Sequence, residues 1–151
     1  MIIAPDRKRT DKTIFTMKIS VNVNLSNDGK VRLNEGRKIA DLNPKELLLC
    51  SAAECAALTL HGILKKEQIE PKSTEVELSG VLDTESVMAR SVYTSFNVCY
   101  RIECNTIGEQ ARIGRAVRLT TDKYCGLFQM LRRIAPLSHE IEIVSIESTE
   151  A

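Results

Sequence analysis

Residues 44–66 constrain the fold more than any other part of the sequence. They are predicted to form one helix because Asn43 can cap it, Pro44 suits its first position and Glu46 stands three residues after the cap. Between residues 47 and 60, Leu, Ala and Cys fall on nearly every side of this helix. A soluble helix that is apolar all round is buried on all sides. We therefore expect the helix to run through the middle of the protein.

The chain as a whole offers little material to wrap such a helix. Its 151 residues fit one domain, and we infer that a second subunit completes the burial in a homodimer. Residues 1–12 are polar and are expected to be a flexible arm. The domain itself is then expected to span residues 13–151.

Alternation of apolar and polar residues predicts strands on both sides of the helix. The first strand covers residues 15–25, and the turn signal Asn27-Asp28-Gly29 leads to a returning strand from Val31 to about Ile39. Later runs predict three more strands: residues 75–82, 94–104 and 139–146.

Two further helices are predicted late in the chain. The first begins near Gly108 and carries an apolar stripe made of Ile113, Ala116, Val117, Thr120, Thr121 and Tyr124. The second is short, begins after Cys125 and ends at Pro136. The resulting order is β-β-α-β-β-α-α-β, which places the chain in the α+β class.

Composition excludes several kinds of partner. Lys and Arg number 21 and Asp and Glu 20, a balance that argues against binding a phosphate backbone. The sequence has no Trp and few aromatic residues, so no platform for stacking bases is expected. We expect no apolar run to approach the roughly 18 residues of a membrane span, and the charged N-terminus does not fit a signal peptide. We expect a cytoplasmic protein without nucleic-acid or membrane partners.

The five cysteines are the main candidates for chemistry. They contain no CxxC pair, and with only two His residues they match no zinc pattern, so neither a metal nor another cofactor is expected. An odd count without an export signal does not favour a disulfide framework. The five thiols are therefore buried, reactive or a mixture of both.

Two of these cysteines could be reactive. Cys55 lies in the middle of the long helix, where position alone favours a core role and where activation would require a nearby cation. Cys125 precedes the last short helix, whose N-terminus could lower its pKa, although a satisfied thiol at a helix junction fits equally well. Cys50 and Cys104 are interpreted as core residues. Cys99 falls on the polar face of its strand, and nothing beside it suggests activation.

Glu54 is a carboxylate within the apolar run of the long helix. An unpaired buried carboxylate is costly, so Glu54 needs a partner, a neutral state or exposure at a subunit boundary.

Two stretches of the sequence resemble a known family. NPKELLLCSAAECAALTL (residues 43–60) resembles the central-helix signature of the OsmC/Ohr family, the osmotically inducible and organic hydroperoxide resistance proteins. DKYCGLFQMLRRIAPLSHEIEI (residues 122–143) resembles the second-cysteine region and closing strand of the same family. The resemblance places Cys55 at the peroxidatic position and Cys125 at the resolving position.

The resemblance implies an intertwined homodimer that acts as a thiol-dependent peroxidase. The Cys55 thiolate would reduce an organic hydroperoxide and become a sulfenic acid, and Cys125 would condense with it to a disulfide. A dithiol reductant, such as a lipoyl dithiol, would reopen that disulfide.

The sequence also departs from the family pattern. The family carboxylate that orients an activating Arg is replaced by Lys45, and the candidate substitute, Glu46, lies about 100° further round the helix. Arg37 is the first candidate for the activating residue, with Arg32 behind it. Gly126 follows Cys125 where family members often have Pro. These differences predict a divergent OsmC-like member.

A second hypothesis is a non-catalytic dimer of the same fold that binds a small apolar ligand or senses the redox state through its thiols. The replacement by Lys45 favours this alternative, and the retained pair Cys55 and Cys125 favours the peroxidase.

Overall fold

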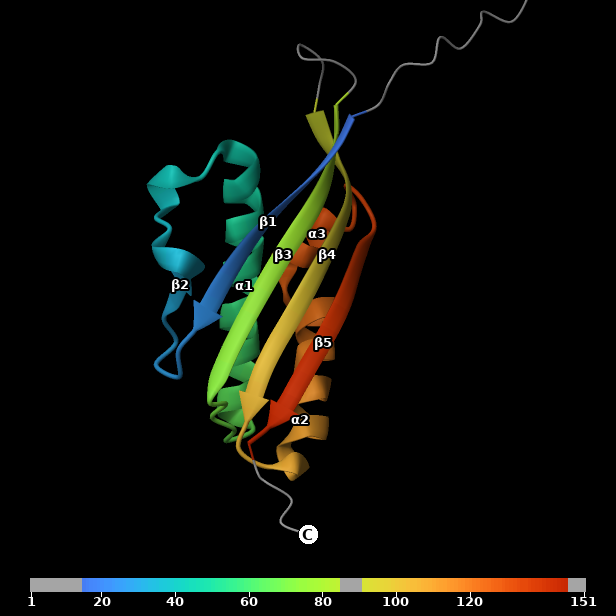
Figure 1. Cartoon of the computed structure of the whole chain (residues 1–151). Helices are drawn as coiled ribbons and strands as arrows, with labels where there is room; N and C mark the ends of the chain where they lie inside the picture. Colours follow the sequence, from blue (N-terminus) through green and yellow to red (C-terminus); the bar gives the residue numbers. More distant parts are fainter. Residues whose placement is uncertain (1–14, 85–90, 147–151) are drawn as a thin grey trace, which may run out of the picture.

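A mixed five-stranded sheet forms one layer of the protein. The computed structural model describes residues 15–84 and 91–146, so the arm predicted for residues 1–12 lies outside the described residues. The strands are β1 (Phe15–Leu25), β2 (Val31–Leu33), β3 (Ser73–Thr84), β4 (Ser91–Cys104) and β5 (Leu137–Ser145). Their spatial order is β2-β1-β3-β4-β5, and all neighbours are antiparallel except β4 and β5, which are parallel (Figure 1).

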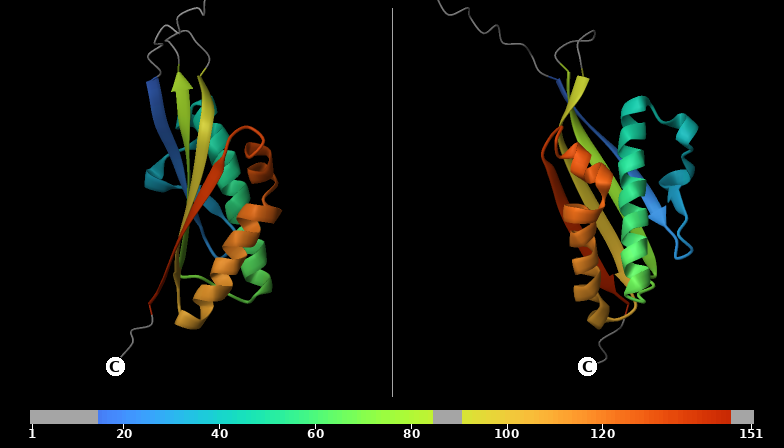
Figure 2. Two further views of the ribbon diagram at one scale, coloured as in Figure 1. Left: turned by 90° about the vertical axis from the view of Figure 1, so that its right-hand side faces the viewer. Right: turned by 180° about the vertical axis from the view of Figure 1, so that it is seen from behind.

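The helices form the second layer and cover one face of this sheet (Figures 1 and 2). They are α1 (Pro44–Lys66), α2 (Ile107–Leu119) and α3 (Gly126–Leu131). The long helix α1 packs mainly against β1 and β3, whereas α2 packs against β5 and β4. This arrangement confirms the predicted α+β class and the predicted order of elements.

The two faces of the sheet follow the predicted alternation. A row of paired residues crosses the sheet beneath the helices, and it consists of Val23, Val76, Tyr100 and Ile141. The row beside it faces away from the helices and consists of Asn22, Glu77, Cys99 and Glu140. Cys99 thus lies on the polar face as predicted, yet it is buried there, and burial raises the pKa of its thiol.

The N-terminus of α1 forms as the sequence predicts. The Asn43 side chain accepts hydrogen bonds from the backbone N–H groups of Lys45 and Glu46, at 3.0 and 2.9 Å. The helix is 23 residues long and by length and composition could cross a membrane, so the expectation that no segment approaches such a span was wrong. In the structure α1 is the core helix, with eight buried residues: Leu49, Cys50, Ala52, Ala53, Ala56, Ala57, Leu60 and Leu64.

One stripe of α1 is not covered within a single chain. Leu48 and Leu58 are 40% and 45% exposed, and Cys55 lies half-buried between them. The prediction that the helix is buried on all sides is therefore wrong for one protomer. The sheet, α2 and α3 cover its other faces.

The returning strand is shorter than the predicted range from Val31 to Ile39. It ends at Leu33, and two 3-10 turns follow, Asn34–Gly36 and Ile39–Asp41. Glu35 and Gly36 have φ values of 61° and 67°, a left-handed conformation that cannot continue a strand.

The apolar stripe predicted for the second helix changes phase near its end. Its first five residues are buried as predicted, but Tyr124 is 53% exposed. The cause is a π-helical turn over Thr120–Tyr124, which directly follows α2. A π turn holds more residues than an α turn, so the side chains after it no longer follow the 3.6-residue period.

Candidate functional site

Two thiols from distant parts of the chain meet at the exposed stripe of α1. Cys55 lies in the middle of α1, and Cys125 is the residue that precedes α3. Their side chains are within hydrogen-bonding reach of each other, and both are free thiols. Cys55 is half-buried, whereas Cys125 is fully buried. The fold therefore brings together the two cysteines that the family resemblance selects.

The Cys125 thiol is held in its protonated form. Burial raises its pKa to about 12, and the hydrogen bond and charge of Cys55 act in the same direction. Backbone N–H groups of Phe128 and Leu127, in the first turn of α3, oppose this effect. The suggestion that a helix terminus lowers the pKa of Cys125 is thus corrected, because its N–H groups act as expected but burial outweighs them.

The neighbourhood of Cys125 contains a contact that sequence patterns do not reveal. The hydroxyl groups of Tyr100 on β4 and Thr121 in the π-helical turn lie 2.7 Å apart, and both residues are fully buried. The sequence predicted Thr121 as part of an apolar helical stripe and Tyr100 only as part of the strand over residues 94–104. Their pairing depends on the packing of the π turn against β4, and no periodic signal encodes it.

Arg37 and Glu46 form an ion pair at the start of α1. Glu46 also accepts a hydrogen bond of 2.7 Å from the amide of Asn43, so the helix cap orients this carboxylate. The ion pair brings together two of the predicted site residues. Glu46 thus makes the Arg contact for which it was the candidate in place of Lys45.

Within one chain, Arg37 faces Cys50 rather than Cys55. Arg37, Cys50 and Glu54 line one cavity of about 390 Å³, and Arg32 lies at the same cavity. Burial and the charge of Glu54 raise the pKa of Cys50, while the charge of Arg37 lowers it. No hydrogen bond or ion pair joins Arg37 to Cys55 within residues 15–84 and 91–146. Glu54 is exposed, which fits the interpretation that it lies at a boundary.

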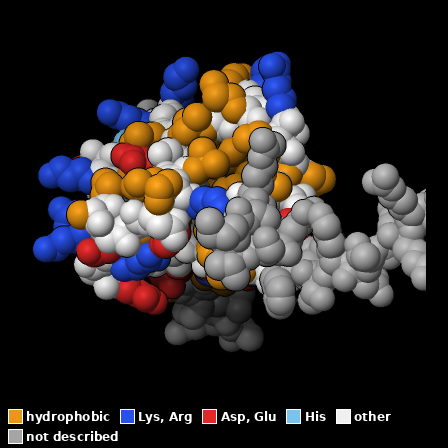
Figure 3. All heavy atoms as spheres, turned by 90° about the horizontal axis from the view of Figure 1, so that it is seen from above, with side chains coloured by type: hydrophobic (Ala, Val, Ile, Leu, Met, Phe, Trp, Pro, Cys, Tyr) orange, Lys and Arg blue, Asp and Glu red, His pale blue; other side chains and the backbone are white. Residues whose placement is uncertain are grey.

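The surroundings of Cys55 are apolar and accessible. Leu48 and Leu58 flank Cys55 on α1. The segment around α3, which packs against α1, also exposes apolar side chains, and Tyr124, Met130 and Ile134 are all more than half exposed. Figure 3 shows how hydrophobic side chains gather at the end of the molecule seen from above. Such a surface admits an apolar molecule or covers another apolar surface.

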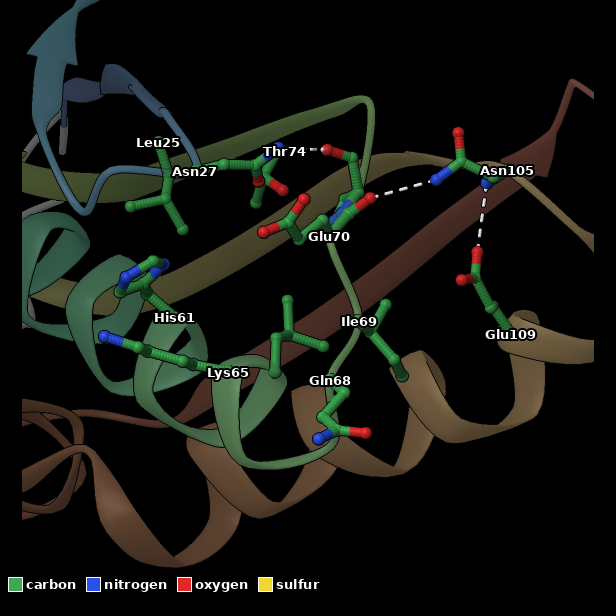
Figure 4. A pocket seen from close by; sticks show the side chains of 12 residues that line it. Leu25, Asn27, His61, Lys65, Gln68, Ile69, Glu70, Thr74, Asn105 and Glu109 are labelled. Carbon is green, nitrogen blue, oxygen red and sulfur yellow. Dashed lines mark hydrogen bonds between the residues drawn. The ribbon is translucent and has the colours of Figure 1, made fainter.

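A separate polar pocket lies at the far end of α1 (Figure 4). It has a volume of about 560 Å³, and it is lined by His61 and Lys65 of α1 and by the loop that carries Glu70. The Asn105 amide donates a 3.0 Å hydrogen bond to the Glu70 carbonyl and holds this loop. None of the residues that line the pocket carries a thiol, so it is not the site of cysteine chemistry.

Comparison with known proteins identifies the family. A family model described as OsmC-like protein matches residues 34–140. The chain belongs to the OsmC-like family. The matched residues include Arg37, Glu46, Cys55 and Cys125 and the elements that carry them.

Individual relatives are distant. The chain is 28% identical to Protein YhfA of Escherichia coli (strain K12) over 103 residues, which is 68% of this chain and 74% of that protein. A hypothetical protein from Aquifex aeolicus VF5 is 25% identical with a TM-score of 0.54, over 85% of this chain and 100% of the other. An organic hydroperoxide resistance protein OsmC from Legionella pneumophila shares the fold, with a TM-score of 0.53 and 11% identity over 85% and 96% of the two chains.

Proposed function

We propose that this protein is a thiol-dependent peroxidase that reduces organic hydroperoxides through Cys55 and Cys125. The observation that carries the proposal is the direct meeting of a half-buried thiol and a fully buried thiol from α1 and the start of α3. Membership of a family that includes proteins named for hydroperoxide resistance supports it. The apolar surface around Cys55 favours an organic hydroperoxide over a small polar one.

The proposed reaction has three balanced steps. The Cys55 thiolate attacks the terminal oxygen of the hydroperoxide, so that an S–O bond forms, the O–O bond breaks and the alkoxide leaves as an alcohol after taking a proton. The Cys125 sulfur then attacks Cys55 Sγ, the S–O bond of the sulfenic acid breaks, and its hydroxyl group leaves as water with the Cys125 proton. Finally, an external dithiol such as a lipoyl group reduces the disulfide and is itself oxidised to a disulfide.

We assign Arg37 and Glu46 to the activation of this site. Their ion pair keeps the guanidinium of Arg37 near the first turns of α1. A cation must lie close to a thiol to favour its thiolate form. Because Arg37 faces Cys50 in a single chain, activation of Cys55 requires a change in its position or a contribution from a second protomer.

A homodimer is part of the proposal. The stripe formed by Leu48, Cys55 and Leu58 lies on the helical layer and is apolar, and a second copy of the chain would cover it. This arrangement would place the reactive thiol at the boundary between subunits. Glu54, exposed in one chain, would then lie at the edge of the interface.

The alternative is a non-catalytic dimer that binds an apolar ligand or senses oxidation. The specific observation in its favour is that Arg37 is directed toward Cys50 and not toward Cys55. A sensor would be oxidised once and would not turn over with a reductant.

A peroxide-consumption assay separates these functions. Wild type, Cys55→Ser and Cys125→Ser are supplied with cumene hydroperoxide and with either dithiothreitol or a lipoyl dithiol. Cys99→Ser is the matched control, because its thiol is buried on the other face of the sheet. The peroxidase proposal predicts turnover in wild type and control, none in Cys55→Ser, and overoxidation of Cys55 in Cys125→Ser.

Peptide mapping under non-reducing conditions completes the test. One equivalent of hydroperoxide should link Cys55 to Cys125 within one chain and leave Cys50, Cys99 and Cys104 reduced. A dominant bridge between Cys50 and Cys55, or an overoxidised Cys55 beside a free Cys125, contradicts the two-cysteine mechanism.

A further inference from the structure

The backbone before Cys125 is fixed by an unusual set of hydrogen bonds. The Cys125 N–H donates to the Thr120 carbonyl at 2.9 Å, a bond across five residues that closes the π-helical turn. The hydroxyls of Thr120 and Thr121 donate to the carbonyls of Ala116 and Val117 in α2, both at 2.9 Å. The π turn is therefore tied to the last turn of α2 by two side chains.

Donor counting fixes the direction of the bond to Tyr100. The single proton of the Thr121 hydroxyl is used on Val117, so the Tyr100 hydroxyl is the donor in its 2.7 Å contact with Thr121. Both side chains are fully buried, so water does not replace this bond if it is lost. Tyr100 thereby joins β4 in the sheet to the turn that ends at Cys125.

Tyr100 is also electrostatically close to the thiol. Burial raises its pKa, and the charge of Cys125 raises it further. The chain of contacts from Tyr100 through Thr121 therefore lies immediately behind the cysteine that meets Cys55.

We propose that Tyr100 and Thr121 are positioning residues that hold Cys125 against Cys55 so that the two thiols close readily to a disulfide. The inference rests on the two-cysteine part of the proposed function and not on the identity of the oxidant. Without the bond from Tyr100, the π turn keeps its ties to α2 but loses its tie to the sheet, and the Cys125 sulfur samples more positions.

The test measures disulfide formation without any hydroperoxide. Full-length protein is equilibrated in mixtures of reduced and oxidised glutathione, in which oxidised glutathione takes two electrons from the thiols and becomes two reduced molecules. The fraction of Cys55–Cys125 disulfide gives an effective concentration of one thiol at the other. In Tyr100→Phe it should fall about fivefold, the change in equilibrium that corresponds to one ordinary buried hydrogen bond. In Thr121→Val, which also loses the bond to the Val117 carbonyl, it should fall by at least as much.

Two variants make the result specific. Tyr93→Phe removes a hydroxyl from another buried Tyr on β4, one that donates a 2.7 Å hydrogen bond to the Lys45 carbonyl, and it should leave the equilibrium unchanged. Thr121→Ser keeps the hydroxyl and should restore the wild-type value. Urea unfolding of each variant shows that the folded state is compared throughout.

The outcomes are distinct. Equal equilibria in wild type, Tyr100→Phe and Thr121→Val overturn the inference, as does an equal loss in Tyr93→Phe. A wild type that forms no Cys55–Cys125 disulfide at any glutathione ratio overturns it as well. If the equilibrium responds as expected while cumene hydroperoxide is not consumed, the peroxidase proposal fails and the positioning role stands.

Discussion

Because folding raises the pKa of the Cys125 thiol, the stability of the protein should depend on pH in the alkaline range. A group whose pKa is raised by folding contributes stability that is fully present below its unfolded pKa and is lost as the pH rises toward the folded value. For Cys125 these limits are 9.0 and about 12. The variant Cys125→Ala removes this one titration and leaves the other groups in place.

The expected size of the effect follows from these two values. Between pH 8 and pH 11, deprotonation of Cys125 in the unfolded chain alone removes about 2–3 kcal/mol from the free energy of unfolding. Cys125→Ala should therefore lose less stability than wild type over the same range, by about this amount. Its own cost, from the small cavity left by the sulfur, does not depend on pH and cancels in this difference.

Urea unfolding at several pH values, in the presence of a non-thiol reductant, measures the difference directly. Other buried acids lower the stability of both proteins at high pH, which is why the comparison uses the variant and not the absolute slope. If wild type and Cys125→Ala lose stability in parallel from pH 8 to pH 11, the thiol is not held protonated by burial and the reasoning is refuted.

Three more substitutions test other parts of the structure. Arg37→Ala should raise the pKa of Cys50, because the Arg37 charge lowers it, and should slow alkylation of Cys55 at neutral pH. Mass spectrometry measures the alkylation of each thiol separately, and an unchanged rate at Cys55 excludes Arg37 as its activator. Leu58→Asp should convert the proposed dimer to a monomer in light scattering, whereas Val144→Asp, at a residue of β5 that is even more exposed, should not. Gly80→Ala should lower the free energy of unfolding in urea by about 1–3 kcal/mol, because the added Cβ would overlap the Tyr93 ring, and Gly62→Ala, which has open space, should not lower it.

The elements that the sequence predicted well are those with a local cause. The alternation in β1 and β4 places one face on the helices, and the cap at Asn43 fixes where α1 begins. These signals depend on neighbouring residues and on a regular period, so contacts with distant parts of the chain do not change them. The same reasoning explains why the order of all the elements was predictable.

The features that were missed depend on contacts between distant residues or on an interruption of the period. β2 ends early because Glu35 adopts a left-handed conformation, and a Glu residue does not predict such a conformation from sequence. The π turn before Cys125 interrupts the helical period without Gly or Pro, so the exposure of Tyr124 could not be foreseen. The direction of Arg37 toward Cys50 depends on how the segment after β2 packs on α1.

The different burial of the two site cysteines has a chemical consequence for the proposed reaction. A thiolate attacks a peroxide and a neutral thiol does not, so a Cys125 held protonated is protected from the substrate while Cys55 remains accessible. Once Cys55 carries a sulfenic acid, its hydroxyl group can take up the Cys125 proton and leave as water while the S–S bond forms, and the high pKa no longer opposes the reaction. Burial would thus determine the order in which the two sulfurs react. The rigid hydroxyl contacts behind Cys125 would then keep the second sulfur in reach during the first step.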